Sequence, residues 1–155
     1  MAGLLGVFGT VVGGVLATWT ARQTADRSAR RAHEELRRQE YRSAVIRFAS
    51  AMGTYRVAEM DLWHAHHGGF RDEASAAADV YRTRTALWDA FYELELSTDN
   101  RALSQQAQRA IERASSIWQS DSKVEMDQRA DQVRSDLAEV VTTARLSEPG
   151  RLPLR

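Results

Sequence analysis

Apolar and polar positions divide the chain into one leading apolar stretch and four amphipathic segments. Residues 2–21 contain no charged side chain, and Arg22 ends the stretch. From Tyr41 onwards, apolar residues recur mostly at spacings of three and four, which is typical of a helix that packs one face against a core. The first such series consists of Tyr41, Val45, Phe48, Ala49, Met52, Tyr55, Met60 and Trp63. The pattern predicts an all-α fold.

Glycine and short polar residues mark the ends of the segments. Gly53 interrupts the first segment without ending it, whereas the pair Gly68-Gly69 closes it, because glycine readily adopts the left-handed turn after a helix. A second helix is predicted from about Asp72 to Leu96, and the polar run 97–100 offers N-caps for a third. The apolar positions of these two segments are Ala76, Val80, Leu87, Trp88, Phe91, Leu94 and Leu96, then Leu103, Ala107, Ala110, Ile111, Ala114 and Trp118.

The joint at residues 119–122 decides the number of helices. A fourth apolar series runs from Met126 to Ala144, and one long helix could contain both the third and the fourth series. A turn is favoured because Ser122 and Glu125 stand in capping-box register, and because four segments of about 21–26 residues suit an up-down-up-down bundle. Residues 121–148 also carry seven acids against four bases, and a turn would fold them back beside the basic first segment. We predict an antiparallel four-helix bundle over residues 41–146, with three helices and a long third as the alternative.

The leading stretch has the length of a membrane span. At 1.5 Å per residue, a helix over residues 2–21 extends about 30 Å, the thickness of the hydrocarbon core of a bilayer. Arginines follow the stretch and none precedes it, so the N-terminus is expected outside and the C-terminal domain in the cytoplasm. We predict a single-pass anchor in the cytoplasmic membrane at residues 1–21. A basic helical stalk at residues 22–40 continues the same helix, and a flexible tail is expected at residues 147–155.

Small residues form two rows along the predicted anchor. Gly9 and Gly13 make a GxxxG pair that Ala17 extends, and Gly6 and Gly14 lie in a second row. Such rows let helices approach closely in lipid, so self-association is expected; the alternative is that these residues pack against nothing specific. The residues expected at the lipid headgroups are Trp19, Arg22, Arg27, Arg30 and Arg31.

Charge is balanced over the whole chain and uneven along it. The chain has 21 basic and 21 acidic residues, which argues against a nucleic acid partner. Residues 22–47 carry eight arginines against four acids. We interpret them as a solvated helix face beside the membrane, with contact to anionic lipid as the sharper alternative. The absence of cysteine excludes disulfides, thiolate metal sites and cysteine nucleophiles.

Histidines cluster at the end of the first segment. Asp61, His64 and His67 fall at i, i+3 and i+6, a spacing that suggests a shared metal ion on one helix face, and Glu93 or Glu95 could add a ligand. However, the chain has one Asp-x-x-His where a di-metal site needs two Glu-x-x-His motifs. The alternative is that the imidazoles meet the negative end of the helix dipole. We assign no metal and no cofactor, and keep the first three residues only as candidates.

Other motifs that carry chemistry are absent from the sequence. It contains no Walker A loop, GxGxxG, GxSxG or HExxH pattern, so no catalytic residue and no small-molecule substrate is assigned. The aromatic residues are predicted to form a shared core rather than a cofactor site. They are Trp63, Trp88 and Trp118, together with Tyr41, Tyr55, Phe91 and Tyr92.

Three stretches carry a resemblance: EYRSAVIRFASAM, ELELSTDNRALSQQAQRAIE and DLAEVVTTARLSEPG. Together with the glycine-rich start and the arginine-rich stalk, they make the chain similar to uncharacterised actinobacterial proteins with a small helical bundle on an N-terminal membrane anchor. The resemblance supports the fold and the anchor and implies no activity.

Three functions are compatible with these observations. The first is a membrane-tethered helical interaction or scaffold module without catalytic activity, whose partners are the lipid bilayer and either a second copy or a cytoplasmic protein. The second is a membrane-active effector that permeabilises the bilayer through its glycine-rich helix. The third is a metal-dependent bundle enzyme built on the histidine cluster. We favour the first.

Overall fold

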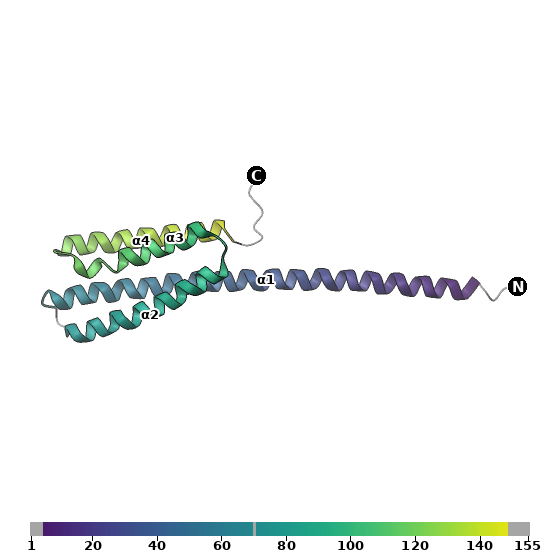
Figure 1. Cartoon of the computed structure of the whole chain (residues 1–155), viewed down its shortest axis with the longest axis horizontal. Helices are drawn as coiled ribbons and strands as arrows, with labels where there is room; N and C mark the ends of the chain where they lie inside the picture. The colour runs from purple at the N-terminus through teal and green to yellow at the C-terminus, as the bar shows by residue number, and fades with distance from the viewer. Residues whose placement is uncertain (1–4, 70, 149–155) are drawn as a thin grey trace. The chain divides into compact units, whose positions relative to one another are not determined.

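The computed structural model describes residues 5–69 and 71–148, with side chains described for residue 28 and from residue 30 onwards. These residues form four α-helices and one short 3₁₀ helix, without a strand (Figure 1). In chain order they are α1 (Leu5–His66), α2 (Glu73–Ser97), α3 (Arg101–Ala114), η1 (Ile117–Gln119) and α4 (Lys123–Leu146). The predicted all-α class is confirmed for this part of the chain, and so is the separation of the third and fourth helices.

The chain divides into two compact units, the first ending at Arg37 and the second beginning at Arg38. α1 contributes residues to both, and its bounds agree with the prediction that helix continues from the first segment through the stalk. None of the helices, as far as the chain is described, combines the length and the apolar character that a bilayer crossing requires. The anchor therefore stays a prediction. Several of the residues assigned to the anchor or to the lipid headgroups lie outside those whose side chains are described: Gly6, Gly9, Gly13, Gly14, Ala17, Trp19, Arg22 and Arg27.

Short polar side chains begin three of the helices. Asp72 accepts a hydrogen bond from the backbone N–H of Ser75 at 2.9 Å, Asn100 caps α3, and Ser122 accepts from the N–H of Glu125 at 3.3 Å. These caps satisfy N–H groups that the first turn of a helix leaves unpaired. At the other end of α1, Gly68 has a φ of +85°, so the glycine pair ends the helix as the sequence predicts.

The third helix is shorter than the matched lengths predicted from sequence. α3 contains 14 residues and ends at Ala114. The Ser115 hydroxyl donates to the carbonyl of Glu112 at 2.7 Å, and the Ser116 hydroxyl to that of Arg113 at 2.8 Å. Serine side chains that take helix carbonyls compete with the backbone ladder, which favours a turn at this point. The chain then passes through η1 before α4 begins.

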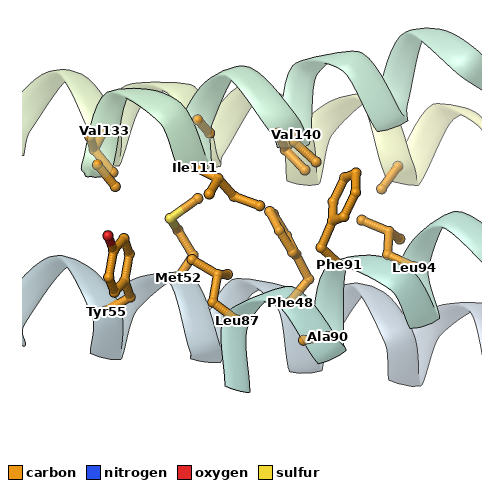
Figure 2. Packing of buried hydrophobic residues seen from close by; sticks show 14 of the residues in the cluster. Phe48, Met52, Tyr55, Leu87, Ala90, Phe91, Leu94, Ile111, Val133 and Val140 are labelled. Carbon is orange, nitrogen blue, oxygen red and sulfur yellow. The ribbon is translucent and has the colours of Figure 1, made fainter. Parts of the chain in front are cut away.

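The bundle unit consists of two layers, with α1 and α2 in one and α3 and α4 in the other (Figure 1). The helices bury their apolar faces between the layers, as Figure 2 shows for residues of all four helices. From α1 and α2 come Phe48, Met52, Tyr55, Leu87, Ala90, Phe91 and Leu94, and from α3 and α4 come Ile111, Val133 and Val140.

Three aromatic or apolar residues predicted in the core lie elsewhere. The side chain of Trp118 is 41% exposed, Tyr92 is exposed, and Leu96 at the end of α2 is 89% exposed. For Trp118 the cause is helix geometry. A 3₁₀ helix has three residues per turn, so the core position after Ala114 falls on Ile117, which is fully buried, rather than on the following residue. The prediction of a shared three-tryptophan core is wrong, because only Trp63 is buried and Trp88 is partly buried.

The last helix lies beside the bundle part of α1, as the charge pattern predicts. The Tyr41 hydroxyl donates to the carbonyl of Ala144 at 2.8 Å, and the Arg42 guanidinium lies 2.6 Å from a carboxylate oxygen of Glu148. The end of α4 thus meets the beginning of the bundle segment of α1, so the two helices run antiparallel.

Candidate functional site

An apolar groove lies between the bundle part of α1 and the last turns of α4. It has a volume of about 330 Å³. Its lining residues are Tyr41, Arg42, Val45 and Ile46 from α1, and Val141, Ala144, Arg145 and Glu148 from α4. Within the bundle unit, this groove combines an apolar floor with a charged rim.

The helix period explains why the groove is open. Tyr41 and Val45 face the core edge of α1, and Ile46, one position further round the helix, is 68% exposed. On α4, Ala144 is buried, and its small side chain leaves space between the two helices at the bottom of the groove. Burial, and then the negative charge of Glu148, raise the pKa of Tyr41. Its hydroxyl therefore stays protonated and keeps its bond to α4.

The rim carries one ion pair and one additional arginine. Arg42 is bound to Glu148, and Arg145 follows on the same side of α4, which gives these three residues a net charge of +1. A groove of this size holds one or two apolar side chains, and charged groups at its rim set the orientation of what binds. The arrangement suits recognition of a protein segment.

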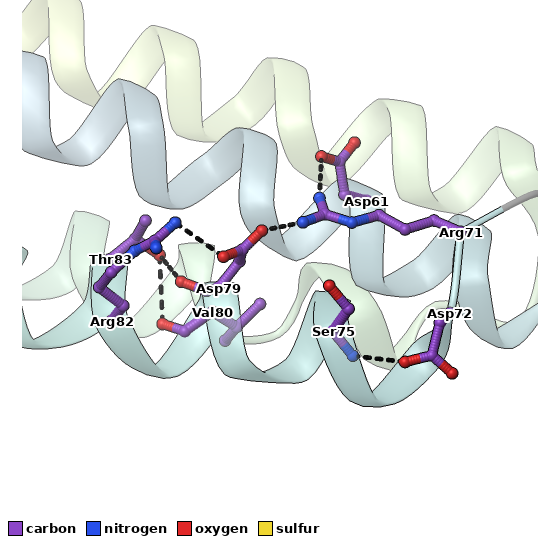
Figure 3. A network of polar contacts seen from close by, with 8 residues as sticks. All are labelled: Asp61, Arg71, Asp72, Ser75, Asp79, Val80, Arg82 and Thr83. Carbon is purple, nitrogen blue, oxygen red and sulfur yellow. Dashed lines mark hydrogen bonds and ion pairs between the residues drawn. The ribbon is translucent and has the colours of Figure 1, made fainter.

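The three residues proposed to share a metal ion do not converge. Six residues along a helix amount to about 600° of rotation, so Asp61 and His67 lie about 120° apart. Asp61 instead pairs with Arg71 at 3.2 Å, and Arg71 also pairs with Asp79, as Figure 3 shows. His67 stacks on the indole of Trp63, with ring centroids 4.1 Å apart.

Two further candidate ligands, His64 and Glu93, contact other residues. His64 is exposed and meets the edge of Trp63, and Glu93 pairs with Arg47 at 2.8 Å. Because α1 and α2 are antiparallel, Glu93 and Glu95 lie near the opposite end of α2 from the histidines. In the part of the chain that the structure describes, no three His, Asp or Glu side chains form a group that could hold a metal ion. The structure thus does not bring Asp61, His64 and His67 together as a ligand group.

The predicted headgroup residues are only partly described. Arg30 and Arg31 are exposed on α1, in the unit that ends at Arg37.

Sequence reasoning missed a buried carboxyl, Glu59, on the core face of α1. It is 1% exposed, and it accepts hydrogen bonds from the Tyr55 hydroxyl and from the backbone N–H of Trp118. Burial raises the pKa of Glu59, against the opposing effect of these hydrogen bonds and of Arg84. A signal was present, because position 59 lies four residues after Tyr55 and four before Trp63, in phase with the apolar stripe.

The fold and the groove define a small, antiparallel helical bundle with an apolar depression on one side. Comparison with known families gives a more specific result. Residues 42–148 match the family model of the KilB plasmid transfer protein, and the chain belongs to this family. The match covers the bundle and nearly all of the groove. It does not include the predicted anchor and says nothing of an actinobacterial origin.

No curated protein and no solved structure matches the chain.

Proposed function

We propose that this chain is a membrane-tethered helical module that binds another protein during plasmid transfer and performs no catalytic step. Membership of the family suggests the process, plasmid transfer, and the groove between α1 and α4 suggests where the partner binds. The observation that carries the proposal is an apolar groove of about 330 Å³ that lies almost wholly inside the family-matched residues.

The proposed occupant is an amphipathic segment of a partner protein that carries a carboxylate beside a large apolar side chain. The apolar side chain would fill the space above Val45 and Val141. The carboxylate would face the arginines at the rim, Arg42 and Arg145. Burial of the apolar group would provide most of the affinity, and the rim charge would favour acidic over basic partners.

The membrane tether remains the proposal made from the sequence. Residues 1–21 would cross the membrane with the N-terminus outside, and Arg30 and Arg31 would lie near the headgroups. The partner would then be cytoplasmic, and the rows of small residues around Gly9 and Gly13 would allow two anchors to associate. The membrane-permeabilising alternative rests on the same residues, and no described side chain favours it.

A pair of matched substitutions on α1 tests the groove. Ile46→Asp places a charge in the groove at a solvent-exposed position, so the bundle is expected to fold. Val57→Asp is the control, because Val57 is also exposed and β-branched on α1 but does not line the groove. Plasmid transfer frequency between mating cells is the readout, with protein level measured by immunoblot.

We expect Ile46→Asp to reduce transfer at least tenfold and Val57→Asp to leave it close to the wild-type level. Equal transfer by the two variants at equal protein levels would overturn the groove assignment. If Ile46→Asp instead dissociates a dimer of the detergent-solubilised chain, a second copy is the occupant rather than a separate protein.

The tether has its own test. Deletion of residues 2–21 is expected to move the protein from the membrane pellet to the supernatant after cell lysis. If the full-length chain is already in the supernatant, the proposed membrane tether is wrong, whereas the proposed role of the groove is unaffected.

A further inference from the structure

A buried polar row on α1 holds the connection between α3 and α4. Tyr55, Glu59 and Trp63 are spaced four residues apart, so they lie on one face of the helix. The indole N–H of Trp63 donates to the carbonyl of Ser120 at 2.7 Å, and Glu59 accepts from the backbone N–H of Trp118. Two successive turns of α1 are thus bonded to backbone groups of the connection, residues 115–122.

Bonds within the connection are short-range, and Arg129 of α4 donates to the carbonyl of Ser116. The Ser120 hydroxyl donates to the carbonyl of Ile117 at 2.8 Å, and the N–H of Ser120 bonds to the same carbonyl at 3.2 Å. Ile117 and Ser120 are buried against the bundle, whereas Trp118 is partly exposed. The bonds from α1 are therefore what ties this segment to the opposite layer, together with the burial of one isoleucine side chain.

Glu59 is the one member of the row whose hydrogen bonding is incomplete. Its Oε2 atom is buried and has no hydrogen-bond partner among the described residues. An ionised carboxylate with an unpaired oxygen inside a protein is strongly disfavoured, whereas a neutral carboxyl group leaves a much smaller penalty. The docked connection therefore favours the protonated form, and ionisation of Glu59 favours a state in which water reaches the carboxylate.

We infer that Glu59 is a proton-dependent latch for the connection between α3 and α4. With the carboxyl neutral, the connection stays docked on α1; with the carboxyl ionised, it is released and uncovers Ile117 beside Trp118. Of the groups that act on the carboxyl, Tyr55 belongs to α1, Arg84 to α2, and the connection supplies the N–H of Trp118. Arg84 is exposed, so it opposes the burial effect only partly. This inference does not rest on the proposed docking groove.

The sign of the pH effect follows from proton linkage. The docked state binds the Glu59 proton more tightly than the released state does, so release is favoured as pH rises. Between the ordinary pKa of a glutamate and its raised value in the docked bundle, the released population increases by up to tenfold per pH unit. Above that window the population becomes constant.

Amide hydrogen exchange of the full-length, detergent-solubilised chain tests the latch. The protection factors of Trp118, Gln119 and Ser120, corrected for the intrinsic pH dependence of exchange, are expected to fall by up to tenfold per pH unit in this window. Protection in the middle of α2, at Leu87 for example, should stay higher than in the connection at every pH, because release is local. Equal protection factors in the connection and in α2 would show that the connection opens only by global unfolding, which would overturn the proposed latch.

Substitutions then identify the group responsible. Glu59→Gln keeps an oxygen for the Trp118 N–H but cannot ionise, so the pH dependence of protection in the connection should disappear. Glu112→Gln, at an exposed position of α3, is the matched control and should retain it. A Glu59→Gln chain that keeps the wild-type pH dependence would overturn the assignment.

Tyr55→Phe provides a second, milder variant. It removes a hydrogen bond that lowers the pKa of Glu59, so the window of pH-dependent protection should extend to higher pH. A purely structural role for Glu59 predicts no such displacement, and an unchanged window would count against the latch.

Discussion

Two buried polar residues on the same side of α1 differ in how completely they are hydrogen-bonded. Tyr41 and Glu59 lie about five helical turns apart, one at each end of the bundle segment. The hydroxyl of Tyr41 brings its own proton and donates it to the carbonyl of Ala144. Glu59 accepts two hydrogen bonds and still has one unpaired oxygen. The hydrogen bonding of Tyr41 is therefore complete at every ordinary pH, whereas burial of Glu59 is favourable only when its carboxyl group carries a proton.

The difference is reinforced by what surrounds each residue. Near Tyr41, α4 is a regular helix whose carbonyl is presented at a fixed position, and the ion pair of Arg42 with Glu148 closes the rim. Near Glu59, the partner is the irregular connection between α3 and α4. Regular helix is the harder of the two to displace, because its backbone bonds form a cooperative ladder.

The largest expected effect comes from Trp63, which combines an apolar ring with a bond to the connection. Trp63→Ala should reduce the free energy of unfolding by about 3–5 kcal/mol, because it leaves a large cavity in the core. Trp63→Phe keeps an aromatic ring but removes the indole N–H that bonds to Ser120, and should cost less, about 1–3 kcal/mol. Equilibrium urea unfolding followed by circular dichroism measures both. Equal losses for the two variants would show that the hydrogen bond, rather than the ring volume, dominates at this end.

The Tyr41 end should respond to loss of a single hydroxyl. Tyr41→Phe removes the hydroxyl donor of the Ala144 carbonyl, which keeps only the N–H of Ser147 at 3.2 Å, so a loss of about 1–2 kcal/mol is expected, independent of pH from 5 to 8. Tyr92→Phe is the matched control, because Tyr92 is exposed and its change should stay within about 0.5 kcal/mol. A pH-dependent loss for Tyr41→Phe would contradict the contrast between the two ends.

The Glu59 end should show the pH dependence that the Tyr41 end lacks. Because the folded state raises the pKa of Glu59, its contribution to stability is complete below the ordinary carboxyl pKa and is lost as pH rises through the raised value. The slope from this group reaches at most about 1.4 kcal/mol per pH unit. Glu59→Gln should remove this slope from urea unfolding curves collected between pH 4.5 and 8. A slope that is unchanged in the variant would assign it to other groups.

Between Tyr41 and Glu59 on α1, Gly53 is a position where a substitution should slightly increase the stability of the bundle. A Cβ atom at Gly53 would meet nothing within 4 Å, and the backbone there is helical, so Gly53→Ala should stabilise the bundle by about 0.5–1 kcal/mol. Gly68→Ala should have the opposite sign, with a cost of about 1 kcal/mol, because Gly68 has a positive φ. Thermal unfolding of the two variants against the wild type decides between these signs.

Helix positions and ends were predictable from local sequence rules. The caps at Asp72, Asn100 and Ser122 and the stop at Gly68 follow from residue types that satisfy or terminate a single turn, and each needs only a few neighbours. The end of α3 was missed because serine hydroxyls can either point to solvent or take helix carbonyls. Ser115 and Ser116 do the latter, and the resulting 3₁₀ turn moved the core position to Ile117.

The candidate site was much less accessible to sequence reasoning. The groove depends on which helices are neighbours near Tyr41 and Ala144, and periodicity within one segment contains no such information. Glu59 was passed over in favour of Met60, although helical phase puts position 59 on the stripe. An acidic residue at a position that the apolar period places in the core normally indicates that the period has been assigned incorrectly. Only the structure shows that Tyr55 and the Trp118 backbone make this exception possible.

The turn after α1 has a practical consequence. Gly68, Gly69 and Arg71 are exposed, and the backbone there belongs to neither helix, so trypsin should cut after Arg71 before it reaches the helices. The core between the two layers does not depend on that peptide bond. The two fragments should therefore remain associated after cleavage, which would allow the protein to be split and reassembled from separately produced halves.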